Sequence, residues 1–312
     1  MAALTYTDAM NEALERLRSV GYEHGRSFVN HAPMAAEALA HMGYADEVPG
    51  WVEGHLRSHA FHDVPERRWA IDPADEGDWR QALGDFGRVA DWADLFEREL
   101  AEAAWTDVLA RWWPRLLPGM SGVLTHGVIR TAHAVRAVQT AGADHGPQLV
   151  ELAHGLGYWA ARHSTGGITV AQDDGEGGDA ARALDDLVAE FSGIYATLSL
   201  RHPIPLIHSV TGPAAVRLVV EHLPPEQRWP SYLVARAVSR TMLDWFHATP
   251  RPAAPLPDAP DVAELFAEAA QIGDEHAIKL AEVAVRHEGY APDPRHAAAA
   301  RVANQAIGRL YR

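Results

Sequence analysis

Residues 262–287 read VAELFAEAAQIGDEHAIKLAEVAVRH, and apolar side chains recur in this stretch at intervals of three and four residues. That spacing places them along one face of an α-helix. Other segments rich in Ala, Leu and Glu repeat the pattern, and no convincing run of alternating apolar and polar residues appears. The sequence therefore predicts an all-α fold. We expect helices at residues 6–20, 32–42, 85–113, 119–140, 148–162, 179–198, 203–222, 230–247, 262–287 and 295–311.

Two stretches interrupt the helical pattern. Residues 164–179 are rich in Gly and Asp, and residues 249–260 contain five prolines, so we expect both to be exposed loops. The roughly 50 residues that follow the second loop are too few for a dependable core of their own. We therefore expect a single compact multi-helix domain over residues 1–312, whose last helices pack back onto the first.

The chain of 312 residues is acidic, with a formal net charge of −15. Such a charge repels both the phosphate backbone of nucleic acids and anionic lipid surfaces. We find no apolar run of the roughly 18–20 residues that cross a bilayer, and no basic segment followed by an apolar one at the N-terminus. We expect a cytoplasmic protein that binds neither nucleic acid nor membranes, and leave the oligomeric state open.

The absence of cysteine narrows the chemistry. It excludes disulfides, thiolate nucleophiles and cysteine-based metal sites, so any metal ion needs nitrogen and oxygen ligands. The 18 histidines supply the nitrogen. The sequence also lacks HExxH, GxSxG, the phosphate-binding GxxxxGK[ST], the dinucleotide-binding GxGxxG and the paired ExxH motifs of di-iron bundles.

Lysine is almost missing from the chain. Of its 27 basic residues 26 are Arg, and the remaining one is Lys279. Lysine differs from Arg chiefly in that its amine loses a proton when it is buried and then acts as a base, a nucleophile or a carbamate former. We therefore expect Lys279 to be a functional or buried structural residue, against the alternative that chance spared it.

Four segments offer histidines in apolar helical surroundings. In the first, DEHAIKL at 274–280, His276 and Lys279 are three residues apart and share a helix face, so both can reach one point. A carbamate formed by Lys279 with CO2 would be an oxygen ligand comparable to a carboxylate. The alternative is a surface helix with an exposed lysine.

The second segment, THGVIRTAH at 125–133, places His126, Arg130 and His133 in one stripe of a helix. At about 1.5 Å per residue, the two histidines are about 10 Å apart along the axis, too far to share a metal ion readily. We take His126 as a metal ligand. His133 and Arg130 are then candidates for orienting a ligand or contacting a substrate.

The other two segments are RHPIPLIHS at 201–209 and NHAPM at 30–34. Prolines favour a helix start near Pro203 or Pro205, which puts His208 about one turn inside the helix, while His202 precedes it. Asn30 is typical of a helix cap, with His31 at the end of the element. His208 taken alone is equally typical of a core histidine whose hydrogen bonds are satisfied, and the His31 segment taken alone is a weak signal. Three imidazoles with oxygen ligands suit non-haem iron or zinc, and the spacings do not select between these two metals.

The same blocks resemble a known family. NHAPMAAEALAHMG (30–43), DWRQALGD (78–85), WWPRLLPGMSGVLTHGVIRTAHAVRAV (112–138), LGYWAAR (156–162), HPIPLIHSVTGPAAVRL (202–218) and DEHAIKLAEVA (274–284) are similar, in this order, to the questin oxidase family. The resemblance covers most of the chain, and its histidine blocks and the DEHxIK block are the specific part.

This resemblance implies an O2-dependent non-haem iron oxygenase that cleaves a ring of an aromatic polyketide or quinone-like substrate such as an anthraquinone. It implies a single Fe(II) held by four histidines and a carboxylated lysine. On the matching positions these are His31, His126, His208, His276 and Lys279. The chain is shorter than the fungal members, so the resemblance does not specify the substrate, and a need for NADPH is left open.

Two other classes of protein remain. The His62-Asp63 dipeptide is the one feature that suggests a metal-dependent hydrolase of the HD type, and such a pair arises often by chance. A non-catalytic helical binding protein with structural histidines is the other class. Its stability would not respond to removal of metal.

Overall fold

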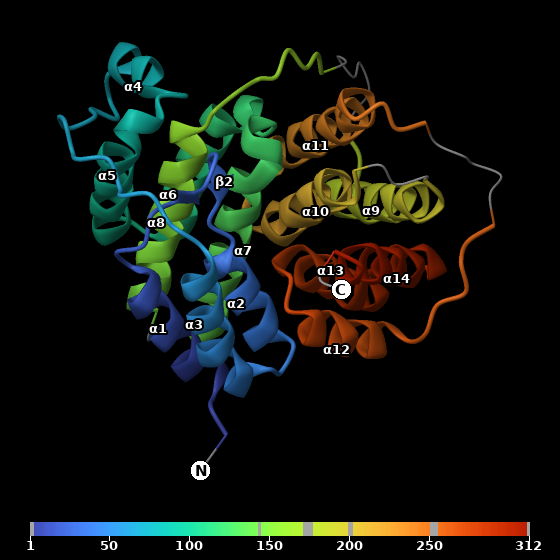
Figure 1. The fold of residues 1–312 in the computed structure, drawn as a ribbon. Helices are drawn as coiled ribbons and strands as arrows, with labels where there is room; N and C mark the ends of the chain where they lie inside the picture. The colour runs from blue at the N-terminus through green and yellow to red at the C-terminus, as the bar shows by residue number, and fades with distance from the viewer. Residues whose placement is uncertain (1–2, 143–144, 171–176, 199–201, 250–254, 311–312) are drawn as a thin grey trace. The chain divides into compact units, whose positions relative to one another are not determined.

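The computed structural model describes residues 3–142, 145–170, 177–198, 202–249 and 255–310. Within these ranges there are fourteen α-helices and one antiparallel pair of two-residue strands, β1 (Glu23–His24) and β2 (Phe28–Val29). The predicted all-α fold is confirmed (Figure 1).

The chain divides into two compact units. Unit 1 comprises Met1–Gly167 with His222–Pro224, and unit 2 comprises Ile168–Glu221 with Pro225–Arg312. The division falls in the Gly- and Asp-rich loop predicted at 164–179. The described parts of this loop and of the proline-rich loop at 249–260 contain no helix and are mostly exposed, whereas 171–176 and 250–254 lie outside the described residues. The single domain expected over the whole chain stays a prediction.

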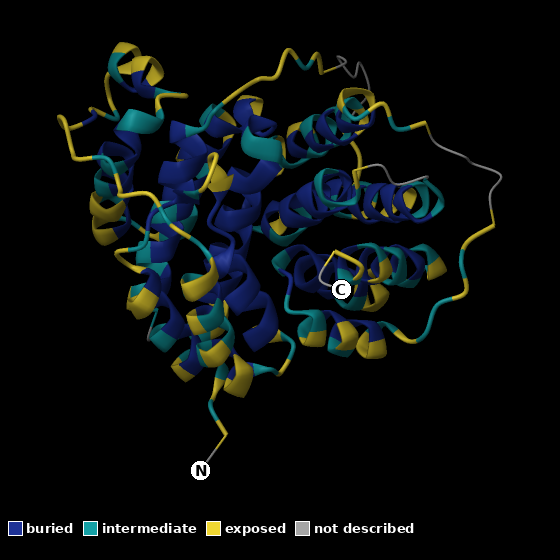
Figure 2. Ribbon diagram, in the orientation of Figure 1, coloured by how far each residue is buried: buried dark blue, intermediate teal, exposed yellow. Residues whose placement is uncertain are grey.

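Unit 1 is built on three helices that pack together, α5 (Val89–Glu102), α7 (His126–Ala141) and α8 (Gly146–Ala161). Its core contains an aromatic cluster in which Trp112 meets the rings of Trp92 and Phe96 edge to face, at centroid distances of 5.5 and 5.1 Å. Figure 2 shows α7 buried along most of its length. The helices of this unit are α1 (Tyr6–Leu17), α2 (Ala32–His41), α3 (Val48–Ser58), α4 (Glu76–Ala82), α5 (Val89–Glu102), α6 (Trp105–Leu116), α7 (His126–Ala141) and α8 (Gly146–Ala161).

Unit 2 packs α9 against α10 and α14, and α13 against α12 and α14. Small and branched side chains fill this core, and Leu265, Ala284 and Ala300 form one buried cluster in it. Its helices are α9 (Ala180–Thr197), α10 (Pro203–Val219), α11 (Pro225–Trp245), α12 (Val262–Ile272), α13 (Glu275–Tyr290) and α14 (Pro294–Gly308).

Two of the predictions of a long helix are wrong, because the structure has two helices in each of these stretches. The stretch predicted at 262–287 breaks at Gly273, whose φ of 74° ends α12, and Asp274 then caps α13 by accepting hydrogen bonds from the N–H groups of His276 and Ala277. Glycine adopts this left-handed conformation without strain, so a Gly-Asp pair both ends one helix and starts the next.

The helix predicted at 85–113 breaks at Ala103, where the backbone is extended. No glycine or proline marks this break. It lets α6 fold back on α5, where Trp112 packs in the aromatic cluster and its indole N–H donates to Glu99 at 2.6 Å. Tertiary packing overrides helix propensity here.

Two further helix starts differ from the prediction by five residues or more. The helix expected from residue 119 begins at His126, because the preceding residues turn the other way, as described below. The helix expected from Pro230 begins at Pro225, since proline suits the first helical position. Helices α3 and α4 were not predicted, and the last predicted residue, Tyr311, lies outside the described residues.

The expectation that no apolar segment is long enough to span a membrane was wrong. The helical segment Pro203–His222 has the length and composition of a membrane-spanning helix, and 72% of its most apolar part is buried within the structure. Such burial is typical of the core helix of a soluble protein. The cytoplasmic location stays a prediction.

A buried histidine should make unit 2 sensitive to acid. His287 is 0% exposed, and burial lowers its pKa from 6.5 to about 4, against the opposing effect of Asp185. Because the folded pKa lies below the unfolded one, the stability that neutral His287 contributes is present above pH 6.5. It is lost as the pH falls towards 4, by about 3 kcal/mol in total.

Urea unfolding of chelator-treated protein between pH 7 and 4 measures this loss, with His287→Gln as the comparison. The variant should lose less stability than the parent over the same range. Equal losses in the two proteins would show that other groups cause the acid sensitivity.

Candidate metal centre

Unit 1 brings two of the predicted ligands together. His31 and His126 are 4% and 5% exposed, and their Nε2 atoms are 2.7 Å apart. Their ring centroids are 4.6 Å apart with the planes at 83°. For comparison, two nitrogens bound to one ion at about 2.1 Å and at right angles are about 3.0 Å apart. The pair is therefore spaced as two adjacent ligands of one ion would be.

The backbone before α7 orients His126. Val123, Leu124 and Thr125 have φ of 42°, 54° and 65°, a left-handed turn made of three residues that are not glycine. Each such residue costs roughly 1–2 kcal/mol. The turn brings the carbonyl of Val123 to His126, which donates its Nδ1–H to it. With Nδ1 protonated, the lone pair lies on Nε2, the atom that faces His31.

Close packing holds the start of α7 in place. A Cβ on Gly127 would lie 2.7 Å from the Cα and Cβ atoms of Trp159 in α8, a separation that side chains do not tolerate. Only glycine at this position lets α7 approach α8 so closely. The residue that follows His126 is thereby fixed against Trp159, which is itself buried.

His31 immediately precedes α2, which begins at Ala32. The cap position of α2 is occupied by His31 and not by Asn30 as predicted, and His31 makes no side-chain capping bond. The Asn30 side chain still bonds the start of the helix, since its oxygen accepts from the N–H of Ala32 at 3.0 Å and its amide donates to the carbonyl of Gly21 at 3.0 Å. These two bonds connect the segments before and after the β1–β2 hairpin and hold His31 at the N-terminal end of α2.

Unit 2 brings the other two predicted histidines together. His208 and His276 are 2% and 7% exposed, and their ring centroids are 5.5 Å apart at 78°. Two imidazoles bound to one ion at a tetrahedral angle have centroids about 5.2 Å apart. His208 lies one turn inside α10, as predicted, and its Nδ1 contacts the carbonyl of Pro205 at 3.1 Å. This contact again leaves Nε2 as the nitrogen with the lone pair.

Lys279 is buried one turn beyond His276. It is 1% exposed, and its Nζ has no hydrogen-bond partner among the described residues. Burial lowers the pKa of the amine from 10.5 to about 8, although Glu275 and Asp274 act in the opposite direction. Roughly a tenth of the amine is then neutral at pH 7 even without a cation nearby. An exposed surface lysine, the alternative considered above, is not what the structure shows.

Asp274, Glu275 and His276 also form a group whose ligand atoms lie within 4.8 Å of one another. The Oδ1 atom of Asp274 already accepts two backbone N–H bonds at the start of α13, at 2.8 and 3.2 Å. Asp274 therefore acts as a helix cap, which explains why an aspartate stands two residues before His276 in the DEHxIK block.

The structure places Arg130 and His133 in buried ion pairs of unit 1. Arg130 bonds Glu151 of α8 through two nitrogens, at 2.6 and 2.8 Å, and its guanidinium lies over the ring of Tyr22. His133 bonds Glu37 of α2 through Nδ1 at 2.7 Å. Neither carboxylate was singled out from the sequence. Glu37 had a signal, because it is the one acidic residue in the apolar block at 30–43.

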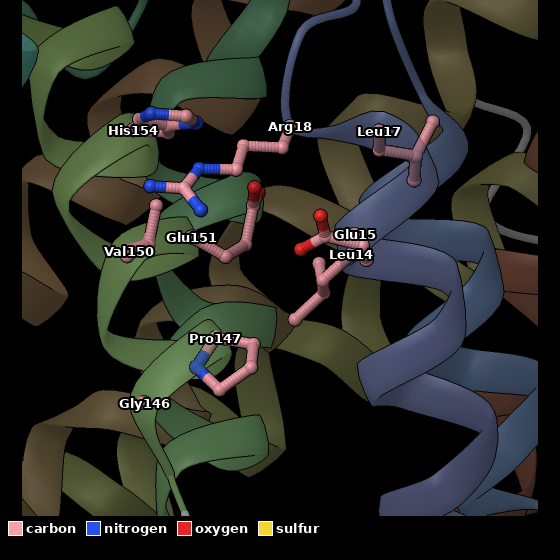
Figure 3. A pocket seen from close by; sticks show the side chains of 9 residues that line it. All are labelled: Leu14, Glu15, Leu17, Arg18, Gly146, Pro147, Val150, Glu151 and His154. Carbon is pink, nitrogen blue, oxygen red and sulfur yellow. The ribbon is translucent and has the colours of Figure 1, made fainter.

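A cavity of about 250 Å³ lies between α1 and α8 (Figure 3). Its wall includes Leu14, Arg18, Glu151 and His154, and none of the predicted metal ligands lines it. Glu151 thus lines this cavity, and its carboxylate oxygens also accept hydrogen bonds from Arg130.

His62 and Asp63, the pair that suggested a hydrolase, are both exposed. They belong to no potential metal-binding group among the residues that the structure describes, and His62 instead contacts the carbonyl of Gly25 at 2.9 Å. The hydrolase alternative gains nothing from this arrangement.

Neither a scan against models of known protein families nor a search of the curated proteins finds a match for this chain. The questin oxidase resemblance therefore stays a prediction based on the motifs quoted above.

Proposed function

We propose, on the resemblance described above, that this protein is a mononuclear non-haem iron oxygenase in which the two histidine pairs would bind one Fe(II) together. His31 and His126 would be the ligands from unit 1, and His208 and His276 those from unit 2. The observation that carries the proposal is that each unit contains two buried imidazoles at the spacing of adjacent metal ligands. Imidazole nitrogens suit iron, and O2 chemistry needs a further coordination position that the protein leaves open.

Lys279 would supply the anionic ligand that four neutral imidazoles lack. Its neutral amine attacks the carbon of CO2, a C–N bond forms, and the nitrogen releases a proton, which leaves a carbamate. The buried Nζ, which has no hydrogen-bond partner within the described parts of the chain and lies one turn from His276, supports this role. The start of α13 also carries partial positive charge, which favours a carbamate over an ammonium group.

The substrate class follows from the resemblance alone. We propose an aromatic polyketide or quinone-like molecule whose ring is cleaved with O2, the bound ferrous ion supplying the electrons that activate O2. The role of the chain's own residues would be to hold the ion, to keep the His126 tautomer fixed through Val123, and to keep water from the buried imidazoles.

Metal analysis of protein purified without chelator tests the proposal. We expect about one iron per chain, and a loss of thermal stability when the iron is removed, because an ion that binds the folded state stabilises it. His62→Ala is the matched control and should retain the iron. Protein without metal, with a stability that chelators do not change, would instead favour a binding protein with structural histidines.

A further inference from the structure

Glu37 is a fully buried carboxylate that connects α2 to α7. It is 1% exposed and binds two side chains of α7: His133 at 2.7 Å, and Arg136 through Nε at 2.8 Å and Nη2 at 2.5 Å. Tyr6 of α1 adds a hydrogen bond at 3.1 Å. We call Glu37, His133 and Arg136 the Glu37 clamp. Three helices of unit 1 therefore meet at one carboxylate.

The charge of Glu37 is maintained despite its burial. Burial acts to raise the pKa of this carboxyl, but Arg136 and the hydrogen bond from His133 outweigh it and lower the pKa to about 2. A buried charge that lost its partners would be costly by several kcal/mol. Sliding α2 along α7 would break these bonds, so the clamp fixes the register of the two helices.

The same two helices carry the metal ligands of unit 1. His31 lies six residues before Glu37, and His126 lies seven residues before His133. At about 1.5 Å per residue, these spacings are about 9 Å and about 10 Å. The His31–His126 contact and the clamp are thus two matched connections between neighbouring helices, one at their N-terminal ends and one about two turns further along.

We propose that Glu37 is a positioning residue for the metal centre: by fixing the register of α2 against α7, it sets the separation of the His31 and His126 nitrogens. The inference rests on the proposed function, since it concerns the same ligands. It gives His133 a role in the clamp rather than in contact with the reacting atoms. Residues that orient ligands in this way commonly change metal affinity 10- to 100-fold when they are replaced.

The chain offers a matched control on the same helix. Glu151 is also a buried carboxylate, 7% exposed, and it holds an arginine of α7, namely Arg130. It comes from α8, however, and its hydrogen bonds among the described residues go to Arg130 of α7 and not to α2. Glu151→Gln and Glu37→Gln therefore remove the same charge from the same kind of ion pair, and only the second disturbs the connection to His31.

The test uses Co²⁺ added to chelator-treated full-length protein. Affinity is measured by competition with a chelator, ligand geometry by the visible absorption of bound Co²⁺, and stability by urea unfolding without metal. We expect Glu37→Gln to bind Co²⁺ 10- to 100-fold more weakly and with a shifted spectrum. Glu151→Gln should keep the parent's spectrum and an affinity within about threefold, although its stability falls by a similar amount.

His133→Gln provides a milder variant in case Glu37→Gln does not fold. It removes one hydrogen bond and leaves the Arg136 ion pair in place, so we expect a smaller loss of affinity in the same direction. Equal losses in Glu37→Gln and Glu151→Gln, or an unshifted spectrum in both clamp variants, would overturn the positioning role while leaving the metal centre intact. A parent protein that binds no Co²⁺ would overturn the metal centre itself, and the positioning role with it.

Discussion

Replacing His126 by alanine is expected to reduce the iron content from about one per chain to background and to abolish O2 consumption with a quinone-like substrate. The variant loses the nitrogen that we propose as a ligand and whose orientation the Val123 carbonyl fixes. Its helical content should stay nearly unchanged, because His126 is only the first of the 16 residues of α7. Metal analysis, an oxygen electrode and circular dichroism measure the three quantities.

His208→Ala applies the same test to the pair in unit 2, with the same expected loss. His154→Ala is the control, since it removes a half-buried imidazole that pairs with Glu97 and should retain iron. If His126→Ala loses the metal and His208→Ala keeps a full complement, the two pairs do not share one ion. Retention in both variants would refute the whole ligand assignment.

Lys279→Arg is expected to be as damaging as Lys279→Ala, with iron content and turnover both reduced to near background. A guanidinium stays charged and cannot be carboxylated, so two positive groups would compete for one place. Lys279→Glu should retain more iron than either, because a carboxylate replaces the oxygen ligand, although its shorter side chain reaches less far.

The measurement is metal content and turnover in buffer supplemented with bicarbonate, since carbamates are lost in acid and escape mass spectrometry. Circular dichroism provides the folding control, because an arginine in a buried position also destabilises the helix around it. A Lys279→Arg variant that binds iron and turns over like the parent would show that the amine is not a ligand.

The composition and helical periodicity of the sequence were sufficient to predict the all-α class and the position of His208 one turn inside α10, where prolines mark the helix start. The start of α13 just before His276 was missed, although Gly273 and Asp274 mark it locally. The burial of Lys279 was also expected, from its uniqueness and its apolar neighbours.

What the sequence did not reveal depends on tertiary contacts. The break at Ala103 carries no local signal and exists because Trp112 packs back on α5. The carboxylates that hold His133 and Arg130 come from helices far away in the chain, 96 and 21 residues distant. Helical spacing predicts which side chains share a face, but it does not predict which face of another helix they meet.

In the left-handed turn at Val123–Thr125, the stability of the backbone and the orientation of the His126 ring make opposite requirements. Glycine at Val123 or Leu124 would adopt the same φ without strain, and the greater freedom of glycine in the unfolded chain would offset part of that gain. It would also free the carbonyl of Val123 to move, and with it the His126 ring that depends on it. If the proposed metal centre is correct, the strain held in this turn is the cost in stability of a preorganised His126 ring.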